Sequence, residues 1–389
     1  MTDQKRNYGI DLLRIVSMIM VVTLHVLGNG WFLDDIDGIT PVFGTMWLLE
    51  IACYCAVNCY ALISGYVGYG KKFKLSGIIQ LWIEVVFYLV LFNLIYKMID
   101  PSSVDDTQMF TSLFPVMSDK YWYFTSYFVL FLFTPFINSL VDKMDFKKHS
   151  LMILLFVIVF SLMLMLSTMK KYDFGNVNDP ITSGYSMFGL NSGYSPLWLM
   201  IMYFTGAYIK KYRLAEKIRP RYCVAVYVVC VLLSLVLKLI TTYLYDHTGH
   251  YGPMISFIVK YYTPTILLCS LALFVLFAKM KCGQKTAKVI SFFSSSAFGV
   301  YIIHLHRNNL QLLRNHLSGF EQTGVIRSLL YIVATVLIIW FVCSMIDKIR
   351  QVLFRLLKIR VLSEKADAFI RKIVSHTMSR YQRIMSQTE

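Results

Sequence analysis

The chain has 389 residues, of which 57% are hydrophobic and only 15% are charged, whereas soluble domains usually carry about a quarter charged residues. The apolar residues come in long blocks, which excludes an ordinary soluble globular domain and indicates a membrane protein with several spans. The formal net charge of +16 does not indicate a nucleic-acid partner, because the basic residues gather in short loops and a tail beside apolar blocks.

The first apolar block, residues 8–29, contains three ionisable residues, Asp11, Arg14 and His25. It has no small-residue cleavage site, so we expect a retained helix rather than a signal peptide. An ionisable side chain inside a bilayer is costly unless it faces protein or water, and each one is therefore a functional candidate. The structural alternatives are that Arg14 extends to the membrane surface and that His25 bonds a neighbour.

The spacing of Arg14 and His25 favours a functional pair. Eleven residues at about 100° each come to roughly 1100°, about 20° beyond three turns, so the two side chains share one face. Asp11 lies one turn before Arg14 on that side. The pair is separated by about 16 Å along the helix axis. We expect this stripe to line a path through the helix bundle.

Ten apolar stretches, most of them within the membrane-spanning range of about 17–25 residues, occur along the chain. They cover residues 8–29, 42–65, 76–98, 121–141, 150–168, 196–211, 222–245, 256–278, 288–305 and 325–347. Two of them, 196–211 and 288–305, are short, which predicts tilted helices or a locally thinned bilayer. We detect no internal repeat, and we predict an all-α polytopic transmembrane bundle of about ten spans, forming one domain over residues 1–348.

Lysine and arginine in the short loops predict the orientation of the spans. Basic residues gather before the first span, at 71–74, 142–149, 209–221 and 279–288, and in the tail. The loops on the other side, at 31–38, 99–106, 172–179 and 245–250, are acidic or neutral. The basic side is therefore predicted to be cytosolic, with both termini inside, in a multi-pass protein of the cell membrane, which we expect to be a bacterial cytoplasmic membrane.

The tail, residues 349–389, alternates apolar and basic residues at helical spacing. We predict a cytosolic amphipathic helix that lies along the inner leaflet, held by its apolar face and by anionic lipid. Because the tail follows directly from a membrane span, its expected partner is membrane lipid rather than nucleic acid.

Three more ionisable residues lie inside predicted spans: Glu50, Glu84 and Lys238. Glu50 lies at a depth comparable to His25, where it would orient the imidazole or bind an acceptor hydroxyl. Glu84 lies in the inner half, where Arg14 or a cytosolic lysine would neutralise it. The alternative for both acids is a structural ion pair, and for Glu84 we favour it.

Eight cysteines occur, none of them in a predicted external loop, so we expect no disulfide framework. Cys53, Cys55 and Cys59 share one apolar block, where small packing residues are a better interpretation than a soft-metal site. Near the predicted outer face, Tyr301, His304 and His306 precede a short amphipathic segment. Histidines at i and i+2 point in different directions on a helix, so we predict no metal and interpret these residues as a polar cap over an outward-opening cavity.

Five segments in order give the chain a resemblance to the acyltransferase-3 family of integral-membrane acyltransferases over residues 7–348. They are "YGIDLLRIVSMIMVVTLHV" with its Arg-x10-His pattern, "AVNCYALISGYVGYGKK" at 56–72, "YWYFTSYFVLFLFTPFIN" at 121–138, "LWLMIMYFTGAYIKKY" at 197–212 and "SSSAFGVYIIHLH" at 294–306. The resemblance implies an acyl transferase that moves an acyl group, most often acetyl, from cytosolic acyl-CoA to an acceptor at the outer face. Its typical acceptor is a hydroxyl of a cell-surface polysaccharide or of a lipid-linked glycan precursor.

Many members of that family carry an added extracytoplasmic esterase-like domain. We expect none here, so the membrane domain would deliver the acyl group itself. Many members also place two arginines near the start of the third span, where this chain has Lys71, Lys72 and Lys74. Lysines bind phosphate as point charges without the bidentate fork of arginine, so these three, with Arg14, are the expected contacts of CoA.

The resemblance and the residues together assign roles to the site. His25 and Arg14 are expected to be catalytic, with His25 acting as a general base on the acceptor or as a nucleophile that forms an acyl-imidazole. Glu50, Trp122, Tyr301 and His304 are expected to bind the acceptor, and acetyl-CoA or another acyl-CoA is the expected donor. The polar loop 169–195 suits sugar contacts, although ordinary loops look the same. A homo-oligomer is compatible with the sequence.

The competing class is a transporter or flippase for a lipid-linked sugar, which would also use about ten helices and an internal polar stripe. Its expected signature, paired discontinuous helices in repeated halves, is not visible in the sequence. A receptor or scaffold is a weaker third interpretation. Binding of CoA discriminates the enzyme from the other two.

Overall fold

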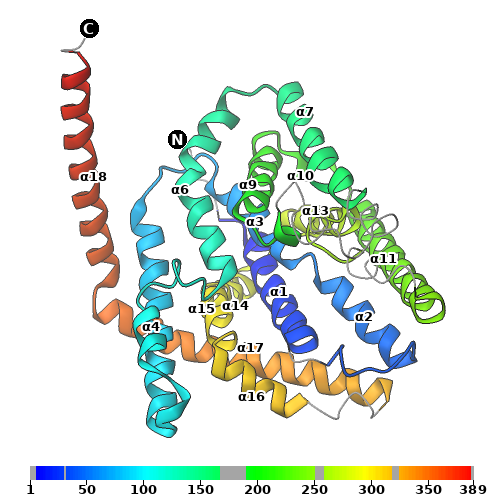
Figure 1. Ribbon diagram of the computed structural model, residues 1–389. Coiled ribbons are helices and arrows are strands. Elements are labelled where there is room, and N and C mark those ends of the chain that lie inside the picture. The colour runs from blue at the N-terminus through cyan, green and yellow to red at the C-terminus, as the bar shows by residue number, and fades with distance from the viewer. Residues whose placement is uncertain (1–5, 30–31, 167–189, 250–257, 318–323, 387–389) are drawn as a thin grey trace. The chain divides into compact units, whose positions relative to one another are not determined.

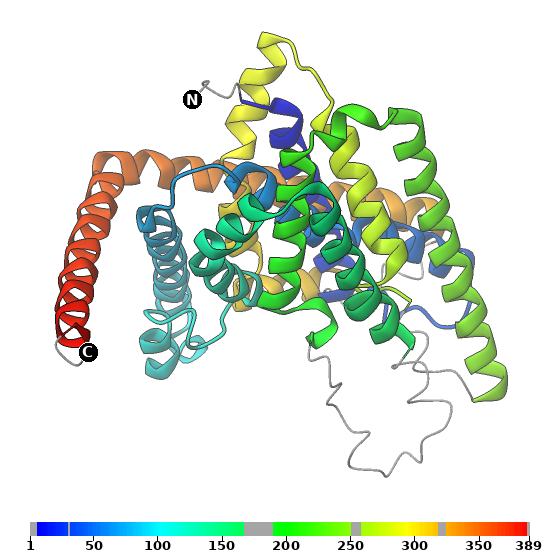
Figure 2. The same ribbon diagram turned by 90° about the horizontal axis from the view of Figure 1, so that it is seen from above.

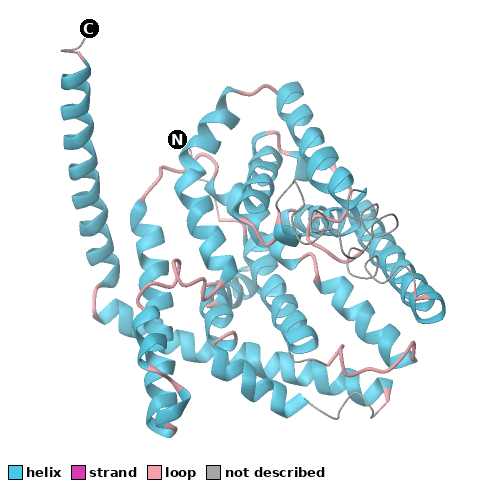
Figure 3. Cartoon of the chain, in the orientation of Figure 1, coloured by secondary structure: helices cyan, strands magenta, loops and turns pink. Residues whose placement is uncertain are grey.

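A computed structural model describes residues 6–29, 32–166, 190–249, 258–317 and 324–386. This part of the chain is built from helices and contains no strand (Figure 3). Eight of its helical segments are long and apolar enough to cross a membrane: Tyr8–Gly28, Pro41–Gly68, Leu75–Ile99, Trp122–Lys143, Phe146–Leu166, Pro220–Thr248, Gln284–His304 and Val325–Leu356. The prediction of an all-α polytopic bundle is confirmed.

The other two predicted spans form shorter helices, α9 (Pro196–Lys211) and α13 (Pro264–Ala278). The span expected to start at residue 256 has its helix begin only at Pro264. Residues 258–263 before it are not helical, and most of them are buried. Side chains satisfy the backbone there: Asn58 donates to the carbonyl of Tyr261 at 2.8 Å, and Ser161 donates to that of Tyr262. Irregular backbone at membrane depth is tolerated where protein surrounds it in this way.

The chain forms two compact units. The first, residues 1–71 and 121–344, holds α1 (Tyr8–Leu24), α2 (Pro41–Cys53), α3 (Ala56–Gly68), α6 (Trp122–Lys143), α7 (Phe146–Val157), α9, α10 (Leu214–Lys217), α11 (Pro220–Thr248), α13, α14 (Gln284–Ser294), α15 (Ala297–His304), α16 (Arg307–Leu317) and most of α17 (Val325–Leu356) (Figure 1). Helix α1 contacts α2, α3, α13, α14 and α15. Figure 2 shows from a second side that other helices cover the dark-blue α1. Asp11, Ser17 and Thr23 of α1 are buried, so protein covers much of its polar surface.

Helices α3 and α9 meet at backbone distance because each contributes a glycine. A Cβ atom on Gly65 would lie 1.9 Å from the carbonyl oxygen of Tyr203, and one on Gly206 would lie 2.2 Å from that of Leu62. Small residues allow such close approach in membrane bundles. The Ile-Ser-Gly-Tyr segment therefore has a packing role in this structure.

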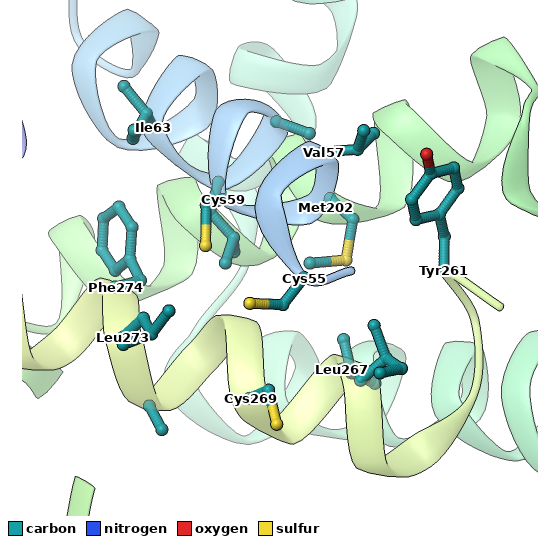
Figure 4. Close-up of a cluster of buried hydrophobic side chains, with 14 of the residues drawn as sticks. Cys55, Val57, Cys59, Ile63, Met202, Tyr261, Leu267, Cys269, Leu273 and Phe274 are labelled. Atoms are coloured by element: carbon teal, nitrogen blue, oxygen red, sulfur yellow. The ribbon is translucent and has the colours of Figure 1, made fainter. Parts of the chain in front are cut away.

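The core of the first unit lies between α3, α9 and α13. Figure 4 shows Cys55, which precedes α3, and Cys59 of α3 beside Met202, Cys269 and Phe274. All eight cysteines are free thiols, and Cys53, Cys55 and Cys59 are buried, as expected of small packing residues. In the described residues, no group of three His, Cys, Asp or Glu side chains is placed to hold a metal ion.

The second unit, residues 72–120 and 345–389, holds α4 (Leu75–Ile99), α5 (Asp106–Thr111), the end of α17 and α18 (Ile359–Met385). Glu84 of α4 forms the ion pair that the sequence predicted, but its partner is Arg350 at 3.0 Å rather than Arg14 or a lysine. Arg350 also binds Asp347 at 2.7 Å, and the hydroxyl of Tyr88 donates to Asp347. Helix α18 packs against α4 and exposes apolar residues, among them Phe369, Ile373 and Met378.

The described part of the predicted tail is thus mostly helical, in the end of α17 and in α18. Its position on a membrane surface, and the division of the chain at residue 348, stay predictions.

Candidate active site

His25 lies where α1 ends and the backbone widens into a π-helical turn, His25–Asn29. Asn7 fixes the other end of α1, because its side chain accepts hydrogen bonds from the backbone N–H groups of Gly9 and Ile10. Single π-helical turns inside helices often occur at functional sites, since they re-aim a side chain. The imidazole of His25 is half-buried.

The imidazole of His25 contacts that of His304, the last residue of α15. Nδ1 of His25 lies 2.8 Å from Nε2 of His304, and the ring centroids are 5.1 Å apart. His304 is buried, and its Nδ1 lies 2.5 Å from the carbonyl oxygen of Val300. The residue predicted to bind the acceptor is therefore a direct partner of the residue predicted to be catalytic. Sequence analysis did not predict this pairing.

At the other end of α1, one buried carboxylate serves two arginines. Asp11 accepts from Arg14 at 2.9 Å and from Arg6 at 2.5 Å. One negative and two positive charges leave this trio with a net charge of +1. The Arg14 side chain is 31% exposed, so it is not fully enclosed by protein. Arg6 is a candidate site residue that the sequence did not indicate, because no helical spacing links it to Asp11.

Tyrosine rings connect the two ends of this stripe. Tyr60 of α3 donates a hydrogen bond to the backbone carbonyl of Arg14 at 2.6 Å, and its ring lies 6.2 Å from that of Tyr123. The ring centroid of Tyr123 lies 6.0 Å from that of Tyr301, and the ring centroid of Tyr301 lies 6.4 Å from that of His304. Tyr301 is thus part of a continuous aromatic wall between Arg14 and the histidine pair.

Trp122, at the start of α6, has a second set of aromatic neighbours. Its ring lies 4.5 Å from that of Tyr194 and is stacked at 6.0 Å on that of Tyr261. Tyr54 completes this group, 4.9 Å from Tyr261. Flat faces of this kind suit the apolar faces of sugar rings, and the role of Trp122 in acceptor binding stays a prediction.

Glu50 of α2 is buried, and its Oε2 atom has no hydrogen-bond partner among the described residues. The carboxylate interacts electrostatically with Lys238, whose ammonium lies 3.6 Å from the centroid of the Trp47 ring. The imidazole of His25 contacts His304, and orientation of that imidazole by Glu50 stays a prediction. Binding of an acceptor hydroxyl by its free oxygen stays a prediction.

The three predicted phosphate-binding lysines are exposed. Lys71 ends the first segment of the first unit, whereas Lys72 and Lys74 belong to the second unit. Their role in binding CoA stays a prediction. The loop 169–195 lies mostly outside the described residues.

Comparison with known proteins identifies a family for the chain. The sequence model of a family described as "Acyltransferase domain", acyltransferase-3, matches residues 7–344 and so contains both histidines and Arg14. No curated protein and no solved structure matches the chain.

Proposed function

The chain belongs to the acyltransferase-3 family and is a multi-pass membrane acyltransferase, and we propose that acyl-CoA is its donor and a glycan hydroxyl its acceptor. The acyl group is acetyl, and the acceptor is a cell-surface polysaccharide or its lipid-linked precursor. The observation that carries this proposal is the contact of His304 with His25, which lies at the end of the helix that bears Arg14. A histidine held in place on the same helix as a cationic group is suited to transfer of an acyl group from a long, charged donor.

The donor end of the proposed site is the trio of Arg6, Asp11 and Arg14. Its net positive charge favours a phosphate or a polarised carbonyl of CoA, and arginine offers paired N–H donors for either. In the proposed orientation this end of α1 faces the cytosol, where acyl-CoA is made. The pantetheine arm then follows the tyrosine wall towards His25, about 16 Å further along the axis. Lys71, Lys72 and Lys74 are proposed to add charge for the phosphates.

The acceptor end of the proposed site is supported by Glu50, Trp122 and Tyr301. The free oxygen of Glu50 is able to accept a hydrogen bond from a sugar hydroxyl, and Trp122 offers a ring face with Tyr261 behind it. His25 removes the proton of the attacking hydroxyl, or first takes the acyl group itself. Both routes require the same imidazole.

The test uses the purified full-length protein in lipid nanodiscs with acetyl-CoA carrying a radiolabelled acetyl group. We expect the protein to bind CoA and to release free CoA as label moves to a glycan acceptor extracted from the producing cells. His25→Ala should lose transfer and keep CoA binding. Failure of the wild-type protein to bind CoA, together with movement of a lipid-linked sugar across the bilayer, would show a transporter instead.

A further inference from the structure

His304 carries its own hydrogen atom on Nδ1. The carbonyl oxygen of Val300, 2.5 Å from this nitrogen, is an acceptor only, so the nitrogen must donate. The side chain is buried, and no carboxylate contacts it in the described residues. Because an unpaired buried charge is costly, the ring is neutral. A neutral imidazole that is protonated at Nδ1 has a lone pair at Nε2.

This lone pair determines the protonation of His25. Nε2 of His304 lies 2.8 Å from Nδ1 of His25, a distance that requires one hydrogen atom between the two nitrogens. Since His304 supplies the lone pair, His25 supplies the N–H. The neutral ring of His25 is therefore protonated at Nδ1 and has its own lone pair at Nε2.

We infer that His304 is the positioning residue of this site, because it fixes the tautomer of His25 and makes Nε2 of His25 the reacting atom. The inference rests on the proposed acyl transfer and assigns its base to one nitrogen. The two carboxylates of α1 and α2 do not take this role: Asp11 lies at the other end of α1 and binds two arginines, and Glu50 interacts with Lys238.

The transfer step then balances as follows. Nε2 of His25 takes the proton of the acceptor hydroxyl while the hydroxyl oxygen attacks the thioester carbonyl carbon. The carbon–sulfur bond breaks, and the thiolate of CoA receives the proton from Nε2 of His25. The products are an ester and free CoA, and the histidine returns to its starting tautomer. His304 holds the ring throughout by accepting from Nδ1, the role that an aspartate has in serine-protease triads.

The first test is spectroscopic and does not depend on activity. In full-length protein with ¹⁵N-labelled histidine, compared with the same protein carrying His25→Gln to assign its signals, we expect His25 to show a protonated Nδ1 and an unprotonated Nε2. Protonation at Nε2 instead would overturn the inference. Absence of any CoA-dependent transfer by the wild-type protein would end the proposed function while this tautomer remained measurable.

The second test compares two replacements of His304. His304→Leu removes the acceptor, so kcat should fall by about 10²-fold or more, with the KM for acetyl-CoA nearly unchanged. His304→Gln offers a carbonyl oxygen in place of Nε2 and should recover at least about a tenth of wild-type kcat, since it restores the accepted hydrogen bond. His247→Gln, at an exposed histidine of α11, is the matched control.

Wild-type kcat in His304→Leu, or equal inactivity of the Leu and Gln variants when both bind CoA, would contradict a positioning role. If His304→Leu does not fold, two results still test the positioning role: the tautomer of His25 in the ¹⁵N spectrum of the wild-type protein, and the kcat of His304→Gln.

Discussion

The hydroxyl of Tyr60 donates a hydrogen bond to the backbone carbonyl of Arg14 at 2.6 Å, which ties α3 to α1 beside the proposed donor site. We expect Tyr60→Phe to lower stability by about 1 kcal/mol, the typical contribution of a single hydrogen bond. Thermal unfolding of the purified protein measures the change, and Tyr243→Phe, at an exposed ring of α11, is the control. Equal melting temperatures for Tyr60→Phe and wild type would show that this bond does not stabilise α1.

The guanidinium of Arg14 is expected to bind the donor. Arg14→Ala removes a charge-assisted hydrogen bond, which contributes about 1.5–3 kcal/mol, so the Kd of acetyl-CoA should rise about tenfold or more. Isothermal calorimetry in nanodiscs measures the Kd. Arg213→Ala, at an arginine whose side chain is 78% exposed, should leave it unchanged. An unchanged Kd in Arg14→Ala would return Arg14 to a structural partner of Asp11.

The backbone contact between α3 and α9 depends on Gly65. Since a Cβ there would lie 1.9 Å from a backbone oxygen, Gly65→Ala should separate the two helices and strongly reduce the yield of folded protein. Gly44→Ala in α2 is the matched control, because nothing lies within 4 Å of its Cβ and alanine favours a helix. Size-exclusion chromatography in detergent compares the two. A monodisperse Gly65→Ala protein at wild-type yield would rule out this contact.

The ion-pair cluster of the second unit is expected to be sensitive to loss of its cation. Arg350→Ala leaves Glu84 and Asp347 without their shared partner, and breaking a buried pair in this way costs about 3–5 kcal/mol. Arg360→Ala breaks a pair with Glu364 that is largely exposed and should cost about 0–1 kcal/mol. Melting temperatures of the two variants give the comparison. A smaller decrease in melting temperature in Arg350→Ala than in Arg360→Ala would show that the buried ion pairs do not stabilise the second unit.

Local properties of the sequence were enough to predict most of the fold and part of the site. Apolar blocks predicted the membrane helices, because the cost of exposed polar groups in lipid acts on each segment separately. Helical periodicity predicted that Arg14 and His25 share a face. The start of α13 was not predictable, because the helix gives way at residues 258–263 to hydrogen bonds from Asn58 and Ser161, which come from other helices.

By itself, then, the sequence determined the class of protein, the spans and the stripe on α1, since each depends on residues within a few turns of one another. Only the tertiary structure decided which partner each polar residue has. His25 and His304 are 279 positions apart, and Glu84 finds Arg350 rather than Arg14. Within an apolar bundle, a polar side chain bonds whichever polar group packing brings within reach, and no local pattern specifies that group.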